Sequence, residues 1–397
     1  MTEKMLVAMI IILALPYLLW RLGRTEYWAP LVVIQILTGI ALGPGLLGSV
    51  FPHTYQALFT PEVMWMLTGL ASWGVILFVW LAGLELDLST AWSERRDGAI
   101  TATCALVFPM LLGGAVGLAL LGQGPNWMGP DAMPWQFVAG IGMACAVTAL
   151  PILMLFMNKL GVLRQPLGQR VLRYASLDDI AIWAVLAVIV LDFDGLLQQL
   201  AFVVLFILSA RLMRRFMPKL ALSDRWSVSL IWLTVIALAA DWSGLHYMVG
   251  AFLAGAAMDR SWFDEEQVDR LREMVLLVLM PVFFLSTGLK TQWTLGGSSV
   301  MLVAMALLLA AIVGKWLGVK VASLVLRWRA GEARLIAWLL QTKALIMIIF
   351  ANVLLDKAII SSGMFTALLL MATLSTMLTI PMATRALEKM PAQSTDG

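Results

Sequence analysis

Residues 170–190 read RVLRYASLDDIAIWAVLAVIV, and they place two adjacent carboxylates, Asp178 and Asp179, inside a run that otherwise reads as a buried membrane helix. Asp179 lies nine residues after Arg170, which corresponds to about 14 Å along a helix. Both aspartates are therefore expected near the centre of the bilayer. An ionisable group at that depth costs at least about 2.5 kcal/mol, so the pair predicts a functional site and not a packing position.

The composition indicates that the whole chain is a membrane protein. Of its 397 residues, 61% are hydrophobic and only 13% are charged, which excludes an ordinary soluble globular protein. Because a spanning helix needs roughly 20 mainly apolar residues, we expect an all-α integral membrane protein with about thirteen transmembrane helices. The expected helices lie at 5–20, 30–48, 64–84, 98–121, 135–157, 168–191, 196–215, 226–240, 243–258, 271–288, 298–326, 333–355 and 362–384.

Lysine and arginine are distributed unevenly among the predicted loops. Most of the 27 such residues lie in loops that follow odd-numbered helices, whereas only Lys4, Lys290 and Lys357 lie in the loops on the other side. Because positively charged loops are retained in the cytoplasm, we expect the N-terminus outside and the C-terminus in the cytoplasm of a multi-pass protein of the cell (inner) membrane. The net charge of +3 then reflects topology, and no nucleic-acid partner is expected.

Lys315 is the cation expected to accompany the aspartates, because it lies twelve residues before Arg327 and hence about 18 Å from the same membrane edge. Adjacent residues on a helix point about 100° apart, so one aspartate can pair with a cation while the other stays open. Burial favours the protonated carboxyl, whereas a neighbouring ammonium favours the carboxylate. Since hard cations prefer oxygen ligands, we expect a site at Asp179 and Asp178 that holds either H+ or a monovalent metal cation, with no cofactor.

Two of the predicted helices are interrupted near their centres. Residues 137–160 carry Thr148-Ala149-Leu150-Pro151, and Pro151 lacks a backbone donor; residues 335–355 carry Gln341-Thr342-Lys343 in an apolar run. The two helices are seven apart and therefore run in opposite directions, as an inverted repeat requires, and such paired breaks point to a transport site. The unwound backbone is expected to offer carbonyl oxygens to a cation, and its opposed helix ends need neutralising charges.

Three other functions fit parts of this pattern. An intramembrane aspartyl protease needs two carboxyls that share one water, which neighbours on one helix cannot do. A cation channel needs a repeated ring or a carbonyl filter, and no such repeat occurs. A symporter that couples Na+ to an organic anion bound by Lys343 stays open as an alternative.

Eight segments of the chain resemble, in order, the monovalent cation:proton antiporters of the second cation:proton antiporter group, which includes bacterial Na+/H+ exchangers and Kef-type K+ efflux systems. Four lie in the first half: APLVVIQILTGIALGPGLLG (29–48), VWLAGLELDL (79–88), AVTALPIL (146–153) and YASLDDIAIW (174–183). Four lie in the second half: GLHYMVGAFLAGAAM (244–258), LMPVFFLSTGLKT (279–291), VGKWLG (313–318) and QTKALIMIIFANVLLD (341–356).

The resemblance implies a Na+/H+ antiporter fold of thirteen helices that works as a homodimer in lipid by an elevator-like cycle. One transmembrane unit over 1–390 would contain a core of about 98–191 and 298–384 interleaved with a dimerisation part, followed by a short cytoplasmic tail at 391–397. Asp179 would be the main carrier of cation and protons, Asp178 would pair with Lys315, and Thr148 would line the site. Exchange of Na+ or Li+ for protons would be electrogenic if Lys315 also releases or takes a proton as its partner binds the cation.

The chain departs from the family pattern at several positions. Asp178 stands where Kef-type proteins tend to carry Gln, which favours Na+ or Li+ over K+; K+/H+ exchange of the Kef-like type is the alternative. Lys343-Ala344 stand where many relatives read Arg-Gly, and Lys343 keeps the positive charge at the broken helix. His246 is a candidate pH sensor, because histidine titrates near neutrality. Glu85, at the cytoplasmic end of its helix, is expected in an interfacial ion pair.

Overall fold

The computed structural model describes residues 2–25, 28–85, 95–191, 196–291, 297–329 and 331–389, and these are helical nearly throughout. No β-strand occurs among the residues in these ranges. The expected all-helical membrane architecture is therefore confirmed. The predicted tail at 391–397 lies outside the described residues.

The number of spans depends on how a span is defined. In the described part of the chain, ten segments are long and apolar enough to cross a membrane, or eleven if a bent helix pair counts as one span. The predicted spans at 168–191 and 243–258 are helical but fall outside this count. α10 (Pro166–Ile189) carries four charged residues, and α13 (Tyr247–Ala256) is only ten residues long. Length and apolarity alone thus miss the helix that carries the aspartates.

The chain divides into two compact units, each assembled from separate stretches of sequence. Unit 1 comprises Met1–Leu13, Pro52–Asp87 and Trp183–Thr287, and unit 2 comprises Ala14–Phe51, Leu88–Ile182 and Gly288–Gly397. α1 (Thr2–Leu22), α10 and α15 (Met280–Leu289) contribute to both units. Unit 2 includes most of the predicted core, and the assignment of that core as the moving part stays a prediction.

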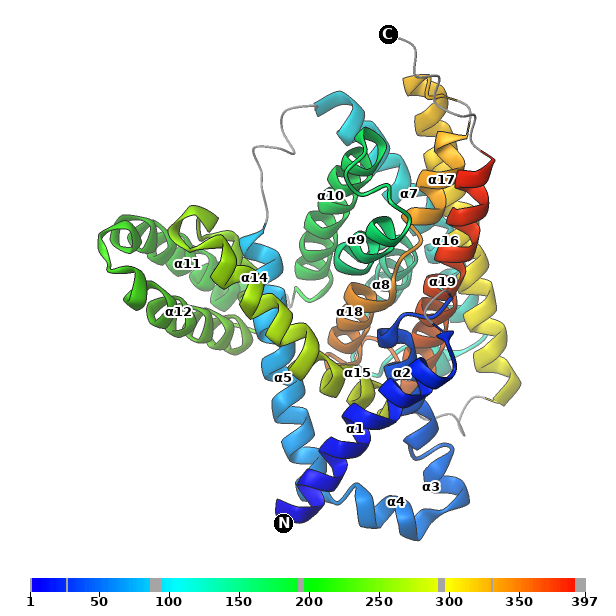
Figure 1. The fold of residues 1–397 in the computed structure, drawn as a ribbon, viewed down its shortest axis with the longest axis horizontal. Helices are drawn as coiled ribbons and strands as arrows, with labels where there is room; N and C mark the ends of the chain where they lie inside the picture. The colour runs from blue at the N-terminus through cyan, green and yellow to red at the C-terminus, as the bar shows by residue number, and fades with distance from the viewer. Residues whose placement is uncertain are drawn as a thin grey trace. The chain divides into compact units, whose positions relative to one another are not determined.

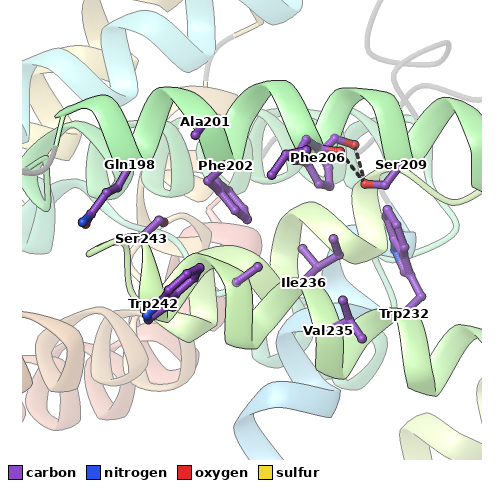
Figure 2. A pocket seen from close by; sticks show the side chains of 12 residues that line it. Gln198, Ala201, Phe202, Phe206, Ser209, Trp232, Val235, Ile236, Trp242 and Ser243 are labelled. Atoms are coloured by element: carbon purple, nitrogen blue, oxygen red, sulfur yellow. Dashed lines mark hydrogen bonds between the residues drawn. The ribbon is translucent and has the colours of Figure 1, made fainter.

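In unit 1 the short helix α13 packs against two longer helices, α5 (Pro61–Leu84) and α12 (Leu222–Trp242). The others are α4 (Pro52–Leu58), α11 (Leu196–Phe216), α14 (Glu265–Met274) and the π-helical turn Val275–Leu279. A pocket of about 530 Å³ lies between α11 and α12, where the Phe206 ring of one helix lies 6.2 Å from the Trp232 ring of the other (Figure 2). None of the twelve described residues that line it is charged, so it offers no carboxylate to a cation.

Unit 2 is built around a tight contact between two long helices. Its helices are α2 (Leu31–Leu42), α3 (Leu47–Val50), α7 (Arg95–Leu121), α8 (Pro134–Ala146), α9 (Leu150–Lys159), α16 (Gly297–Leu326), α17 (Glu332–Leu339), α18 (Ala344–Asp356) and α19 (Ser362–Glu388), with the first part of α10. Gly314 and Gly318 lie one turn apart on α16. A Cβ atom added to Gly314 would lie 2.3 Å from Pro109 Cα, and one added to Gly318 would lie 2.1 Å from the Cys104 carbonyl oxygen, both on α7. Only glycine permits this approach, which fixes the position of the neighbouring Lys315.

The interruptions predicted from the sequence are present in two helices of unit 2. The first helix ends at Ala146 and resumes at Leu150, with Pro151 in the new first turn, where a missing N–H costs no hydrogen bond. The second ends at Leu339, resumes at Ala344 and bends by 46°. In Figure 1, α8 and α9 lie beside α18, and Ala149 N–H donates to the Thr342 carbonyl (2.6 Å), so the two breaks meet.

Candidate functional site

The site lies where the two breaks meet, and its best-defined part is a buried ion pair. Lys315 Nζ of α16 lies 2.9 Å from Asp178 Oδ2 of α10, with side-chain exposures of 0% and 1%. Thr148 Oγ1, at the first break, lies 2.8 Å from the same carboxylate oxygen and 2.9 Å from the Leu340 carbonyl. The structure therefore brings together three residues singled out in the sequence, and one oxygen of Asp178 is fully engaged by protein groups.

Asp179 has a different environment, although it is the next residue. It is 7% exposed, against 2% for Asp178, and its Oδ1 atom is buried without a hydrogen-bond partner among the described residues. Asp178 Oδ1 also has no such partner. Burial of a carboxylate oxygen without a partner is costly, and a bound proton or cation removes that cost. The two free oxygens are thus the acceptors that the fold leaves open.

Lys343, at the same crossing, binds backbone carbonyls and, among the described residues, no carboxylate. Its side chain is fully buried, and Nζ donates to the carbonyls of Cys145 (2.6 Å) and Val147 (3.0 Å) at the end of α8. Lys315 Nζ donates to the carbonyl between them, that of Ala146 (2.6 Å). Because the C-terminal carbonyls of a helix carry partial negative charge, the two ammonium groups together neutralise the end of this half-helix.

The backbone of the breaks is less available than the sequence indicated. We expected unwound carbonyl oxygens to face a cation, but those of Cys145, Ala146 and Val147 each accept from a lysine. The carbonyls of residues 341 and 342 accept from Ser375 Oγ and Ala149 N–H, respectively, and that of Leu340 lies 2.9 Å from Thr148 Oγ1, whose one proton it shares with Asp178. In this conformation the open ligands are therefore carboxylate oxygens and not main-chain oxygens.

Two further predicted residues lie in unit 1. His246 is buried at the start of α13, and its Nδ1 accepts from the N–H of Met248, which makes it the N-cap of that helix. A role in pH sensing stays a prediction. Glu85 forms an ion pair with Arg272 of α14, which confirms the expectation of an ion pair for this residue. Its neighbour Asp87, in the same GLELDL segment, lies outside the described residues.

Sequence reasoning missed the contribution of α19. Ser375 and Thr376 are buried, and their hydroxyls bond to the backbone of the second break. The available indication was a cluster of four hydroxyl residues, at 373, 375, 376 and 379, in the middle of a mainly apolar helix. Hydroxyl side chains commonly bond to their own helix, so the pattern alone does not reveal a bond to a neighbour.

The comparison with known proteins agrees with this arrangement. The profile of the family described as "Sodium/hydrogen exchanger, transmembrane" matches residues 7–387. The chain is 29% identical over 378 residues to the Na(+)/H(+) antiporter NhaS4 of Synechocystis sp., a match that covers 91% of this chain and 92% of that protein. It is 26% identical to the K(+)/H(+) antiporter 1 of Saccharomyces cerevisiae over 89% of this chain, which spans only 43% of that longer protein.

A solved structure shares the fold. The sodium proton antiporter MjNhaP1 from Methanocaldococcus jannaschii, determined at pH 8, matches with a TM-score of 0.65 over 97% of this chain and 99% of that chain. The sequence identity is 14%, so the likeness concerns the arrangement of helices. It supports the expected antiporter fold.

Proposed function

Because the chain belongs to the sodium/hydrogen exchanger family, and is therefore a cation/proton antiporter and not an enzyme, we propose that it exchanges Na+ or Li+ for protons at Asp179. The observation that carries this proposal is the contrast between neighbours. Asp178 is held by Lys315 and Thr148, whereas Asp179 Oδ1 is buried without a partner among the described residues. A carboxylate kept in this way binds either a proton or a cation, and that competition couples their movements.

The proposed cycle follows from this competition. A cation that reaches the open oxygens of Asp179 and Asp178 displaces protons to the same side of the membrane. The loaded site then faces the other side, where protons displace the cation. Lys315 stays beside Asp178 throughout, or gives up a proton when the cation takes over its partner; in the second case two protons leave for one cation and the exchange is electrogenic.

The choice of Na+ or Li+ rests on the ligands. Coulomb attraction falls with distance, so a small cation gains more from the two carboxylates than K+ does. K+ is the second candidate, because a K(+)/H(+) antiporter is among the relatives. Symport of an organic anion has weaker support, because Lys343 already donates to two carbonyls.

The wider setting is proposed from the sequence pattern and the family. Unit 2 carries Asp178, Asp179, Thr148, Lys315 and Lys343, and we propose that it is the moving core of an elevator-type cycle within a homodimer embedded in membrane lipid. The asymmetric distribution of positive charge supports an N-terminus outside and a C-terminus in the cytoplasm of the cell membrane.

The test is transport in proteoliposomes that contain the whole chain. Solid-supported-membrane currents and an internal pH dye are recorded after jumps of Na+, Li+ or K+, for the native protein and for Asp179→Asn and Asp178→Asn. We expect Na+ or Li+ to drive proton movement with net current, and Asp179→Asn to abolish both. Proton movement with K+ alone would select the second candidate. Proton movement in Asp179→Asn equal to the native protein would overturn the assignment of the site.

A further inference from the structure

The second break is held from outside the two crossing helices by a pair of hydroxyl groups on α19. Thr376 Oγ1 accepts from the backbone N–H groups of Lys343 (3.2 Å) and Ala344 (3.0 Å), the first donors of α18. Such donors have no partner within their own helix and need an external acceptor when buried. Lys343 has no capping bond from its own side chain, so a residue 33 positions further along the chain supplies the cap.

Ser375 engages the other end of the same break. Its Oγ donates to the Gln341 carbonyl (2.8 Å) and lies 3.2 Å from Gln341 Oε1. The Gln341 amide in turn donates from Nε2 to the Ala311 carbonyl (2.8 Å), one turn before Lys315 on α16. Adjacent residues of α19 therefore fix both the carbonyl side and the N–H side of the break, and link it to the helix that carries Lys315.

These contacts bear on the ion site through Lys343. Thr376 fixes the backbone of the residue whose ammonium group holds the Cys145 and Val147 carbonyls. Those carbonyls flank Ala146, which Lys315 binds, and precede Thr148, which binds Asp178. Ser375 and Thr376 are at most 1% exposed, so no bulk water is available to replace a lost bond. A shift at residue 343 is thus transmitted to the groups that hold Asp178.

We propose that Ser375 and Thr376 of α19 are positioning residues for cation/proton exchange, because they hold the interrupted helix α17/α18 in the geometry that orients Lys343 toward the first break. This inference rests on the proposed function. Neither hydroxyl is assigned to the cation; each acts through the backbone of the break.

The experiment compares Thr376→Val, which removes the acceptor at nearly constant shape, with Thr376→Ser, which keeps it. Thr373→Val is the matched control, because Thr373 lies on the same helix, is 1% exposed and donates to the Leu369 carbonyl of its own helix (2.8 Å). Ser375→Ala tests the second bond separately. For each variant in proteoliposomes, the apparent KM for Na+, Li+ and K+, the maximal rate and the pH profile are measured.

Loss of one buried hydrogen-bond acceptor changes an equilibrium constant, here the one that governs cation binding, roughly tenfold. We expect Thr376→Val to raise the apparent KM of the transported cation about tenfold and to shift its pH profile, with Thr376→Ser and Thr373→Val within about twofold of the native protein. Hydrogen exchange of the peptide that contains Lys343 and Ala344 should accelerate in Thr376→Val and stay unchanged in Thr373→Val. Hydrogen exchange can also be measured on a variant that no longer transports, so the inference is tested in that case too.

Two outcomes would overturn the inference while the proposed function stands: native KM and pH profile in both Thr376→Val and Ser375→Ala, or equal losses in Thr376→Val and Thr373→Val. If the native chain moved protons with none of the three cations, the proposed function and the inference would fail together.

Discussion

Asp178→Asn and Asp179→Asn are chemically the same substitution at neighbouring positions, yet the structure predicts that they differ severalfold in their cost to stability. Asparagine at 178 leaves the fully buried Lys315 ammonium with the Ala146 carbonyl but without its carboxylate. Removal of one partner from a buried ion pair costs about 3–5 kcal/mol. Asparagine at 179 removes a carboxylate whose Oδ1 has no partner in the described chain, and should cost about 1 kcal/mol or less.

The difference converts into a measurable shift in melting temperature. An unfolding entropy of about 2.1 cal/mol/K per residue gives about 0.8 kcal/mol/K for 397 residues, so Asp178→Asn should melt about 4–6 °C lower and Asp179→Asn within about 1 °C of the native protein. The 17 tryptophans provide a fluorescence signal in detergent. The double variant Asp178→Asn/Lys315→Met should recover more than half of the loss, because it removes both charges. Equal melting of the two single variants, or no recovery in the double variant, would refute the reasoning.

Four further predictions follow from individual contacts. Thr148→Val, which loses the hydroxyl beside Asp178, should raise the apparent KM for Na+ about three- to tenfold in current measurements, and Thr148→Ser should restore it. Lys343→Met leaves two buried carbonyls without their donor and should destabilise the protein by about 2 kcal/mol or more in the melting assay. Gly318→Ala should cost about 1–3 kcal/mol by pushing α16 from α7, whereas Gly98→Ala, which meets only an ordinary contact at 3.6 Å, should melt like the native protein. In the pH range where the site is protonated, the apparent KM for Na+ should rise about tenfold for each unit that pH falls if one proton competes, and about a hundredfold if two compete; a KM independent of pH would contradict direct competition.

The positions of the two breaks could be predicted because their causes are local. Pro151 cannot donate a backbone hydrogen bond, and Gln341-Thr342-Lys343 interrupt an apolar run, so each break is visible in a few letters of sequence. The depth of Asp178 and Lys315 followed from the rise per residue of a helix. Two opposite charges at one depth in a membrane lower their cost by pairing, which predicts a partner for Lys315, whereas the choice of Asp178 as that partner came from the resemblance to the antiporter family.

The bonds that hold the crossing could not be predicted, because they depend on which helices are neighbours. Thr373 and Thr376 are both buried threonines on α19, yet within the described part of the chain Thr373 bonds only to its own helix whereas Thr376 also caps α18. The sequence also placed Lys343 correctly as the charge at a break, but its partners are carbonyls of the other interrupted helix. The same contacts explain why the main-chain oxygens expected for a cation are already engaged.

The central claim is that one site, at Asp179, holds either protons or a cation. The most direct measurement is the release of protons when NaCl or LiCl is added to purified protein in weakly buffered detergent solution, followed with a pH dye and compared with choline chloride. We expect saturable release from the native protein and from Thr373→Val, and none from Asp179→Asn. Release from Asp179→Asn of the same size and cation dependence as from the native protein would contradict the account.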